Sequence, residues 1–159
     1  MIDDLEQMVG FSVTGVFGTM LNLEIKPETP TDNMANGEPH MASSVGFIGR
    51  LTGVVYIYCA CSFARRITSG LLGLSEAEID GDEMVNDAMG ELANMVVGNL
   101  KSRLSDRGIP CVLTIPSIVR GSQFTIEPVS TSERKVFAYR CGGNQLLVEV
   151  LIKPGTSAS

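Results

Sequence analysis

The order of the predicted elements indicates an α+β domain, with helices packed on one face of an antiparallel sheet of about six strands. Apolar residues recur at helical spacing in two long segments, one near the N-terminus and one in the middle of the chain. Short strand-like runs separated by turn residues flank the second of these segments. The chain has 159 residues, 44% of them hydrophobic, which suits one domain with one core.

The first predicted helix covers residues 3–21. Its apolar side chains at helical spacing are Leu5, Met8, Val9, Val13, Val16, Phe17, Met20 and Leu21. Residues 22–26 are expected to be extended. A loop is predicted over residues 27–40, because this stretch is polar and contains three prolines. The single histidine, His40, is placed in that loop.

A β-hairpin is predicted next, with strands over residues 43–50 and 53–59. Its turn is assigned to Leu51, Thr52 and Gly53. Ser62 can cap a short helix over residues 63–72, and Gly73 can end it. A serine and a glutamate three residues apart then form a capping box at Ser75 and Glu78.

The C-terminal third is predicted to be strands, over residues 111–115, 122–127, 135–140 and 145–152. Residues 142–144 read Gly-Gly-Asn and predict a hairpin turn. No internal repeat is evident. We expect a single domain over residues 1–153 and a disordered tail over 154–159.

Composition argues against several function classes. The net charge of −6 makes the chain a poor non-specific ligand for nucleic acid or anionic lipid. The cysteines, Cys59, Cys61, Cys111 and Cys141, form no CxxC pair, so they predict reduced core residues and no zinc site. The N-terminus lacks a basic leader, and the longest apolar stretch is too short to span a membrane. The expected location is therefore the cytoplasm.

The second long helix is predicted over residues 82–104 and carries the candidate site. Its apolar arc consists of Val85, Met89, Leu92, Ala93, Val96, Val97, Leu100 and Leu104. The opposite side presents a polar strip of Asp87, Glu91, Asn94 and Gly98. Asn86 points toward the apolar side, and the sequence gives no reason for it.

A polar strip on a helix is most often a solvated surface, and that interpretation stays open. Two features favour a docking surface instead. Gly98 costs helix stability, which suggests that something approaches the backbone there. Met84 and Met95 border the strip, and methionine side chains adapt readily to a partner.

Glu91 and Asn94 cannot form a self-sufficient hydrolase, because no nucleophile or metal cluster accompanies them. The amide of Asn94 can hold a water molecule in place. Such a pair suffices when the substrate brings its own metal and a reactive bond. The aspartyl phosphate of a receiver domain brings both, and its hydrolysis depends mainly on alignment and charge stabilisation.

The segment from Asp87 to Asn94 resembles the signature of the CheC/CheX/FliY phosphatase family, in which a Glu follows an Asp or Ser by four residues and precedes an Asn by three. Pro116 stands where the family has a proline. The flanking residues look like those of CheX members, and the resemblance extends from about residue 46 to residue 121. The first helix has Val9 where a second copy of the signature would need Asn.

The resemblance implies a phosphatase that dephosphorylates a CheY-like response regulator and ends a chemotaxis or related two-component signal. Glu91 would pair with the receiver's active-site lysine, and Asn94 would hold the attacking water. Asp87 would assist at the periphery, and Gly98 would let the receiver backbone come close.

The resemblance also implies a homodimer with paired sheet edges, for which the C-terminal strands are candidates. No cofactor of its own is expected, since Mg²⁺ would come from the receiver. The alternative is a non-catalytic binding module for a phosphorylated regulator, as in flagellar switch components.

Overall fold

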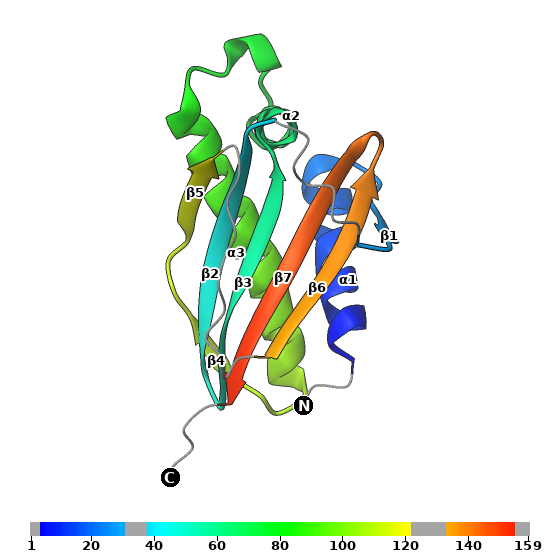
Figure 1. The fold of residues 1–159 in the computed structure, drawn as a ribbon, viewed down its shortest axis with the longest axis vertical. Helices are drawn as coiled ribbons and strands as arrows, with labels where there is room; N and C mark the ends of the chain where they lie inside the picture. Colours follow the sequence, from blue (N-terminus) through cyan, green and yellow to red (C-terminus); the bar gives the residue numbers. More distant parts are fainter. Residues whose placement is uncertain (1–3, 31–37, 122–132, 155–159) are drawn as a thin grey trace.

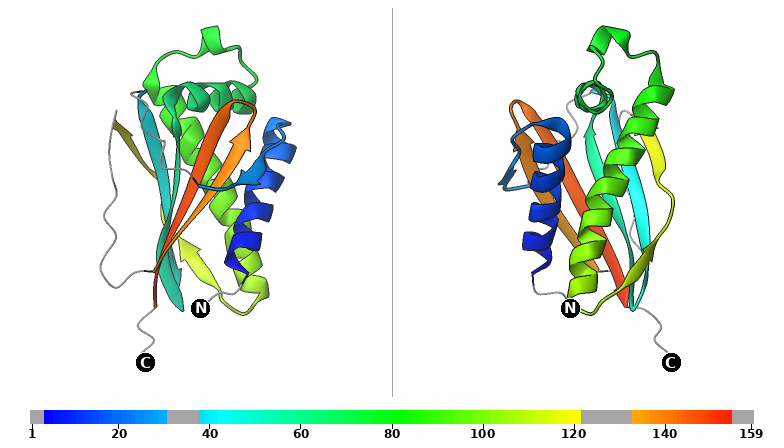
Figure 2. Two further views of the ribbon diagram at one scale, coloured as in Figure 1. Left: turned by 45° about the vertical axis from the view of Figure 1, so that its right-hand side comes forward. Right: turned by 180° about the vertical axis from the view of Figure 1, so that it is seen from behind.

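The computed structural model describes residues 4–30, 38–121 and 133–154. A seven-stranded antiparallel sheet forms one layer, with strand order β1-β6-β7-β3-β2-β4 and with β5 also paired to β2. Helices α1 and α3 lie side by side against one face of this sheet, and α2 crosses one end (Figures 1 and 2). The predicted α+β architecture, with helices on one face, is confirmed.

The N-terminal helix confirms the prediction for residues 3–21 with one local difference. Helix α1 spans Leu5–Val16, and its continuation η1, Phe17–Leu21, widens to a π-helical turn. Asn22 ends it in the left-handed conformation, with φ 53°. The short strand β1, Lys26–Glu28, follows and pairs with β6, so the predicted loop begins later than expected.

The predicted hairpin exists, but its turn lies elsewhere. Strands β2, His40–Gly49, and β3, Leu51–Ala60, are separated only by Arg50. The assignment of Leu51, Thr52 and Gly53 to the turn is wrong, because these residues pair with β7 on the other side. Gly53 is needed there for a different reason: a Cβ would collide with the Leu151 carbonyl oxygen.

The placement of His40 in a loop is also wrong. His40 is the first residue of β2, and it is buried. Its Nδ1 lies 2.8 Å from the Glu38 carbonyl oxygen. A strand start beside a polar stretch gives little sequence signal, which explains the error.

The helix after the hairpin, α2, spans Cys61–Leu72. The prediction that Ser62 caps it is wrong, since Ala60 occupies the cap position and the Ser62 hydroxyl instead contacts Glu38 Oε1 at 3.3 Å. Gly73 ends α2 with φ 69°, as predicted. The capping box is confirmed on a 3-10 turn, η2, Glu76–Glu78.

Helix α3, Asp82–Asp106, is the longest of the described helices. The remaining strands are β4, Cys111–Leu113; β5, Ser117–Gly121; β6, Glu133–Cys141; and β7, Asn144–Pro154. The strand predicted over 122–127 lies outside the described residues, and β5 was missed. Pro154, predicted to begin the tail, is still part of β7, and residues 155–159 are not described.

The topology repeats although the sequence shows no repeat. In chain order, α1, β1 and the β2–β3 hairpin match α3, β4 with β5, and the β6–β7 hairpin. Strands β3 and β7 pair at the centre, and the edge strand of each half pairs with the hairpin of the other half. The two halves therefore enclose one core, to which α1, α3 and the facing side of the sheet all contribute.

Inside that core, Ser12 of α1 donates a hydrogen bond to Asn99 Oδ1 of α3 at 3.1 Å.

None of the helices in the described ranges has the length and apolar character needed to cross a membrane.

Candidate functional site

Helix α3 is positioned by its apolar side. Gly81 precedes it with φ 86°, and acidic Asp82 and Glu83 occupy the first turn, where they complement the helix dipole. All residues of the predicted apolar arc are buried, namely Val85, Met89, Leu92, Ala93, Val96, Val97, Leu100 and Leu104. Packing on the sheet and on α1 thereby fixes which side of the helix faces outward.

The outward side carries the predicted strip. Asp87 and Glu91 are exposed, and Asn94 is half-buried. Within the described part of the chain, no side-chain hydrogen bond or ion pair occupies any of the three. A carboxylate and an amide one turn apart are therefore available to a partner molecule.

The residues around the strip differ in how far they fit a docking surface. Gly98 is half-exposed, and a Cβ built on it would meet nothing within 4 Å. Packing inside the described protein thus does not require glycine there. Met84 and Met95 are half-buried and pack partly on the core, so only part of each side chain is available to a partner.

The connection between β4 and β5 flanks the strip. Gly90 is buried, and a Cβ on it would lie 3.4 Å from Pro116 Cγ, so Pro116 covers the helix next to Glu91. Ile115 is 85% exposed beside it. Pro116 therefore lies against α3, which the sequence spacing alone could not show.

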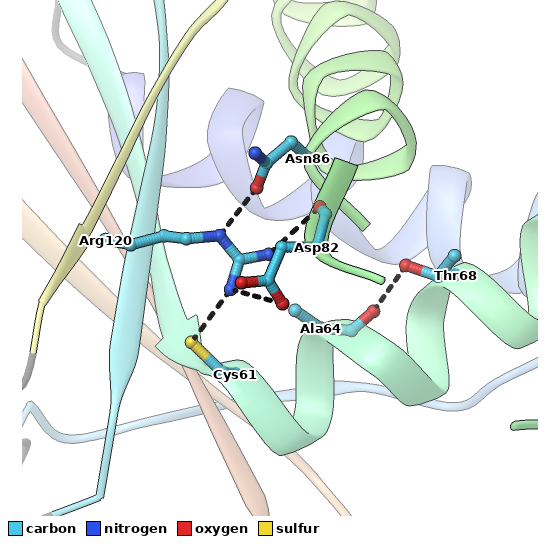
Figure 3. A network of polar contacts seen from close by, with 6 residues as sticks. All are labelled: Cys61, Ala64, Thr68, Asp82, Asn86 and Arg120. Atoms are coloured by element: carbon cyan, nitrogen blue, oxygen red, sulfur yellow. Dashed lines mark hydrogen bonds and ion pairs between the residues drawn. The ribbon is translucent and has the colours of Figure 1, made fainter. Parts of the chain in front are cut away.

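Asn86, which the sequence left without a role, contacts the edge strand β5. Its Oδ1 accepts a hydrogen bond from Arg120 Nε at 2.6 Å. Arg120 also reaches the Asp82 carboxylate, at 3.6 Å, and the Cys61 sulfur, at 3.7 Å (Figure 3). The sequence does not single out Arg120, because an isolated arginine in a strand that was not predicted forms no recognisable pattern.

Three of the cysteines are unsuited to act as nucleophiles. Burial raises the pKa of Cys59 to about 12. Burial also raises the pKa of Cys61, although the nearby Arg120 guanidinium opposes the shift. Cys111 has a pKa raised by burial as well. Thiols held in the protonated form are poor nucleophiles and poor metal ligands.

Across the residues that the structure describes, no three His, Cys, Asp or Glu side chains gather in a way that could hold a metal ion. A hollow of about 620 Å³ lies between α1, β1 and β6, and none of its lining residues belongs to the strip. The candidate site is a helix surface on which the Glu91 carboxylate can pair with a cation and the Asn94 amide can hold a water.

Comparisons with known proteins match most of this chain. The family model described as chemotaxis phosphatase CheX matches residues 41–140, which include all of α3. The CheY-P phosphatase CheX of Thermotoga maritima is 27% identical over 117 residues, covering 73% of this chain and 75% of that protein.

The solved structures with a similar fold include the following two. A CheC-like superfamily protein from Shewanella sp. PV-4 has a TM-score of 0.80 at 29% identity, covering 96% of this chain and 99% of that one. The CheX of the CheX–CheY–BeF3–Mg²⁺ complex from Borrelia burgdorferi has a TM-score of 0.71 at 21% identity, covering 92% and 96%.

Proposed function

The chain belongs to the chemotaxis phosphatase CheX family, and we propose that it hydrolyses the aspartyl phosphate of a CheY-like response regulator through Glu91 and Asn94. The observation that carries the proposal is the exposed Glu91 carboxylate and the half-buried Asn94 amide on α3, with no side-chain partner among the described residues. The family match includes this helix, and a relative that is 27% identical is a CheY-P phosphatase.

In the proposed complex, the outward side of α3 lies across the receiver's phosphorylation site. Glu91 pairs with the receiver's lysine through a charge-assisted hydrogen bond, which orients the two proteins. Asp87, one turn earlier, contacts the receiver at the rim, and the open backbone at Gly98 permits close approach.

Asn94 holds the attacking water in line with the phosphorus. The water oxygen forms a bond to phosphorus as the bond to the aspartyl oxygen breaks, giving inorganic phosphate and a free carboxylate. The proton of the water leaves with the phosphate or to solvent. An amide performs this positioning without being a base, because the phosphoryl group is already activated.

Magnesium belongs to the receiver in this proposal. The ion neutralises the phosphoryl oxygens, and this chain supplies none of its ligands. The Borrelia burgdorferi complex, which contains CheY, Mg²⁺ and a beryllium fluoride, supports that division.

The test is the decay of a phosphorylated receiver with and without this protein, together with its affinity for the receiver loaded with beryllium fluoride. Acceleration of the decay supports hydrolysis. Tight binding without acceleration would instead assign the chain a binding role of the kind known for switch components. Neither acceleration nor binding to a panel of receivers would refute both.

We also propose a homodimer formed at a sheet edge. Strand β7 is not available for this, because it lies between β6 and β3, which corrects the expectation for the last strand. Among the described residues, β1 covers only Ala138–Arg140 of β6, so the first half of β6 has a free edge. A monomeric mass at micromolar concentration in solution would contradict the proposal.

A further inference from the structure

The side of α3 that faces β5 is held at two points one turn apart. Asn86 and Gly90 lie on the same face of the helix. Asn86 accepts a hydrogen bond from Arg120, and Gly90 lies under Pro116. Both contacts come from the short segment that leads into and forms β5, an edge strand that pairs with β2.

Arg120 uses all three of its guanidinium nitrogens at this point, as Figure 3 shows. Nε donates to Asn86 Oδ1 at 2.6 Å, and Nη2 donates to the Asp82 carbonyl oxygen at 3.3 Å. Nη1 lies 3.6 Å from Asp82 Oδ1 and 3.7 Å from Cys61 Sγ. A single side chain thereby joins the edge strand to the first turns of α3 and of α2.

Simple electrostatics does not favour this location. The N-terminal ends of two helices carry partial positive charge, and a cation beside them is unfavourable. Asp82 offsets part of that repulsion. What the arginine contributes is geometry, because its planar fork fixes both the distance and the orientation of the groups that it binds.

The orientation matters for the proposed site. Asn86 and Glu91 point in directions about 140° apart around the helix axis. Apolar packing already turns Asp87 and Glu91 toward solvent. The hydrogen bond that holds Asn86 at the sheet edge adds a directional constraint on the rotation of the half-helix that ends at Asn94.

We propose that Arg120 is a positioning residue: through Asn86 and the first turn of α3, it sets the rotation at which Glu91 and Asn94 meet the receiver. This inference rests on the proposed function of those two residues. Arg120 itself touches neither of them in the structure. Its effect should appear more in the rate of the bound complex than in its formation, because holding a water in line tolerates less misplacement than an ion pair made by the flexible Glu91 side chain.

The experiment compares Arg120→Met and Asn86→Ala with wild type, using a phosphorylated receiver and saturating amounts of this protein in single turnover. Each variant should lower the rate by about tenfold or more, since small misplacements of a positioned group are costly. Affinity for the beryllium fluoride-loaded receiver should change by less than about threefold. The double variant should be little slower than either single variant, because both remove one interaction.

The matched control is Arg107→Met, at the other end of the same helix. Arg107 Nη2 lies 2.8 Å from Asp4 Oδ2, so this arginine also ties α3 to another element. Its loss should leave the single-turnover rate within about twofold of wild type. Asn86→Asp, which keeps an acceptor for Arg120, should restore most of the rate lost in Asn86→Ala.

Amide hydrogen exchange over residues 83–91 supplies a readout that does not depend on turnover. Exchange should become faster in Arg120→Met and stay unchanged in Arg107→Met. The inference is overturned if the active wild type and Arg120→Met have equal rates, or if exchange over 83–91 does not change. If wild type itself fails to accelerate dephosphorylation, the proposed function is wrong. In that case, unchanged exchange in Arg120→Met would separately show that Arg120 does not hold the first turns of α3 in place.

Discussion

Helices α1 and α3 occupy matching places in the two halves of the fold, yet only α3 presents a candidate site. Both lie on the same face of the sheet (Figure 2). Each is followed by an edge strand that pairs with the hairpin of the other half: β1 pairs with β6, and β5 pairs with β2. Glu6 of α1 is exposed, as Glu91 of α3 is. Three residues later, however, α1 has Val9, 1% exposed and part of the core, where α3 has half-buried Asn94.

The edge strands β1 and β5 also differ in the side-chain hydrogen bonds that they form. Arg120 of β5 bonds to the helix, at Asn86. In β1, Glu28 instead accepts hydrogen bonds from Arg140 and Gln145, which belong to the sheet. The repeated topology thus provides two similar helix positions, and in the proposed function only α3 combines an outward amide with a contact from its edge strand.

The largest expected effect is the loss of phosphatase activity when Asn94 of α3 is replaced, compared with the matching replacement of Glu6 on α1. Asn94→Ala should lower the single-turnover rate of receiver dephosphorylation by about a hundredfold, because the water loses its positioning group. Stability should change by less than about 0.5 kcal/mol, since the side chain makes no described hydrogen bond. Glu6→Ala on α1 is the matched control and should leave the rate unchanged. Full activity in Asn94→Ala would remove the proposed mechanism.

A second variant tests whether an asparagine at position 9 of α1 can create a second site. Val9→Asn would complete the Glu-x-x-Asn spacing, but it would bury an amide among apolar side chains. We expect a loss of about 2 kcal/mol in unfolding free energy and no gain in rate. Chemical denaturation measures the first, and single turnover in an Asn94→Ala background measures the second. Restored turnover there would show that rotation and flanking contacts matter less than the residue pair.

Glu91→Ala should have a smaller effect than Asn94→Ala on the bound rate but a clear effect on binding. Removing a charge-assisted hydrogen bond to the receiver's lysine should weaken affinity about tenfold. Affinity for the beryllium fluoride-loaded receiver can be measured by titration, with Glu6→Ala again as control. Equal affinities of wild type and Glu91→Ala would mean that Glu91 does not dock the receiver.

Local chemistry decided which parts the sequence could predict. The apolar arc of α3 follows from the helical periodicity of the sequence, and it was predicted correctly. The end of α2 at Gly73 follows from the backbone freedom of glycine, and it was also predicted correctly. His40 and the turn at Arg50 were missed because these strand ends are set by pairing with residues distant in sequence: His40 pairs with Gly121 of β5, and Leu51 pairs with Pro154 of β7. The Arg120 contact with Asn86 joins residues 34 positions apart, so no local pattern could reveal it.

The smallest expected effect distinguishes the two edge strands by pH. The hydrogen bond from Arg140 lowers the pKa of Glu28 below its usual value. Arg120, in contrast, donates hydrogen bonds to two neutral acceptors, the Asn86 side-chain oxygen and the Asp82 main-chain carbonyl, and the Asp82 carboxylate lies farther away, at 3.6 Å. A lowered folded-state pKa means that the stabilisation is complete above the unfolded value of 4.5 and is lost as pH falls through the folded value. Acid should therefore loosen β1 before β5. The thermal unfolding midpoints of Glu28→Gln and wild type should be measured between pH 7 and pH 3. The midpoint of the variant should be lower by about 1 °C to 3 °C at neutral pH, and the two midpoints should become equal at the acid end. Parallel curves with a constant offset would mean that the Glu28 contact does not depend on its charge.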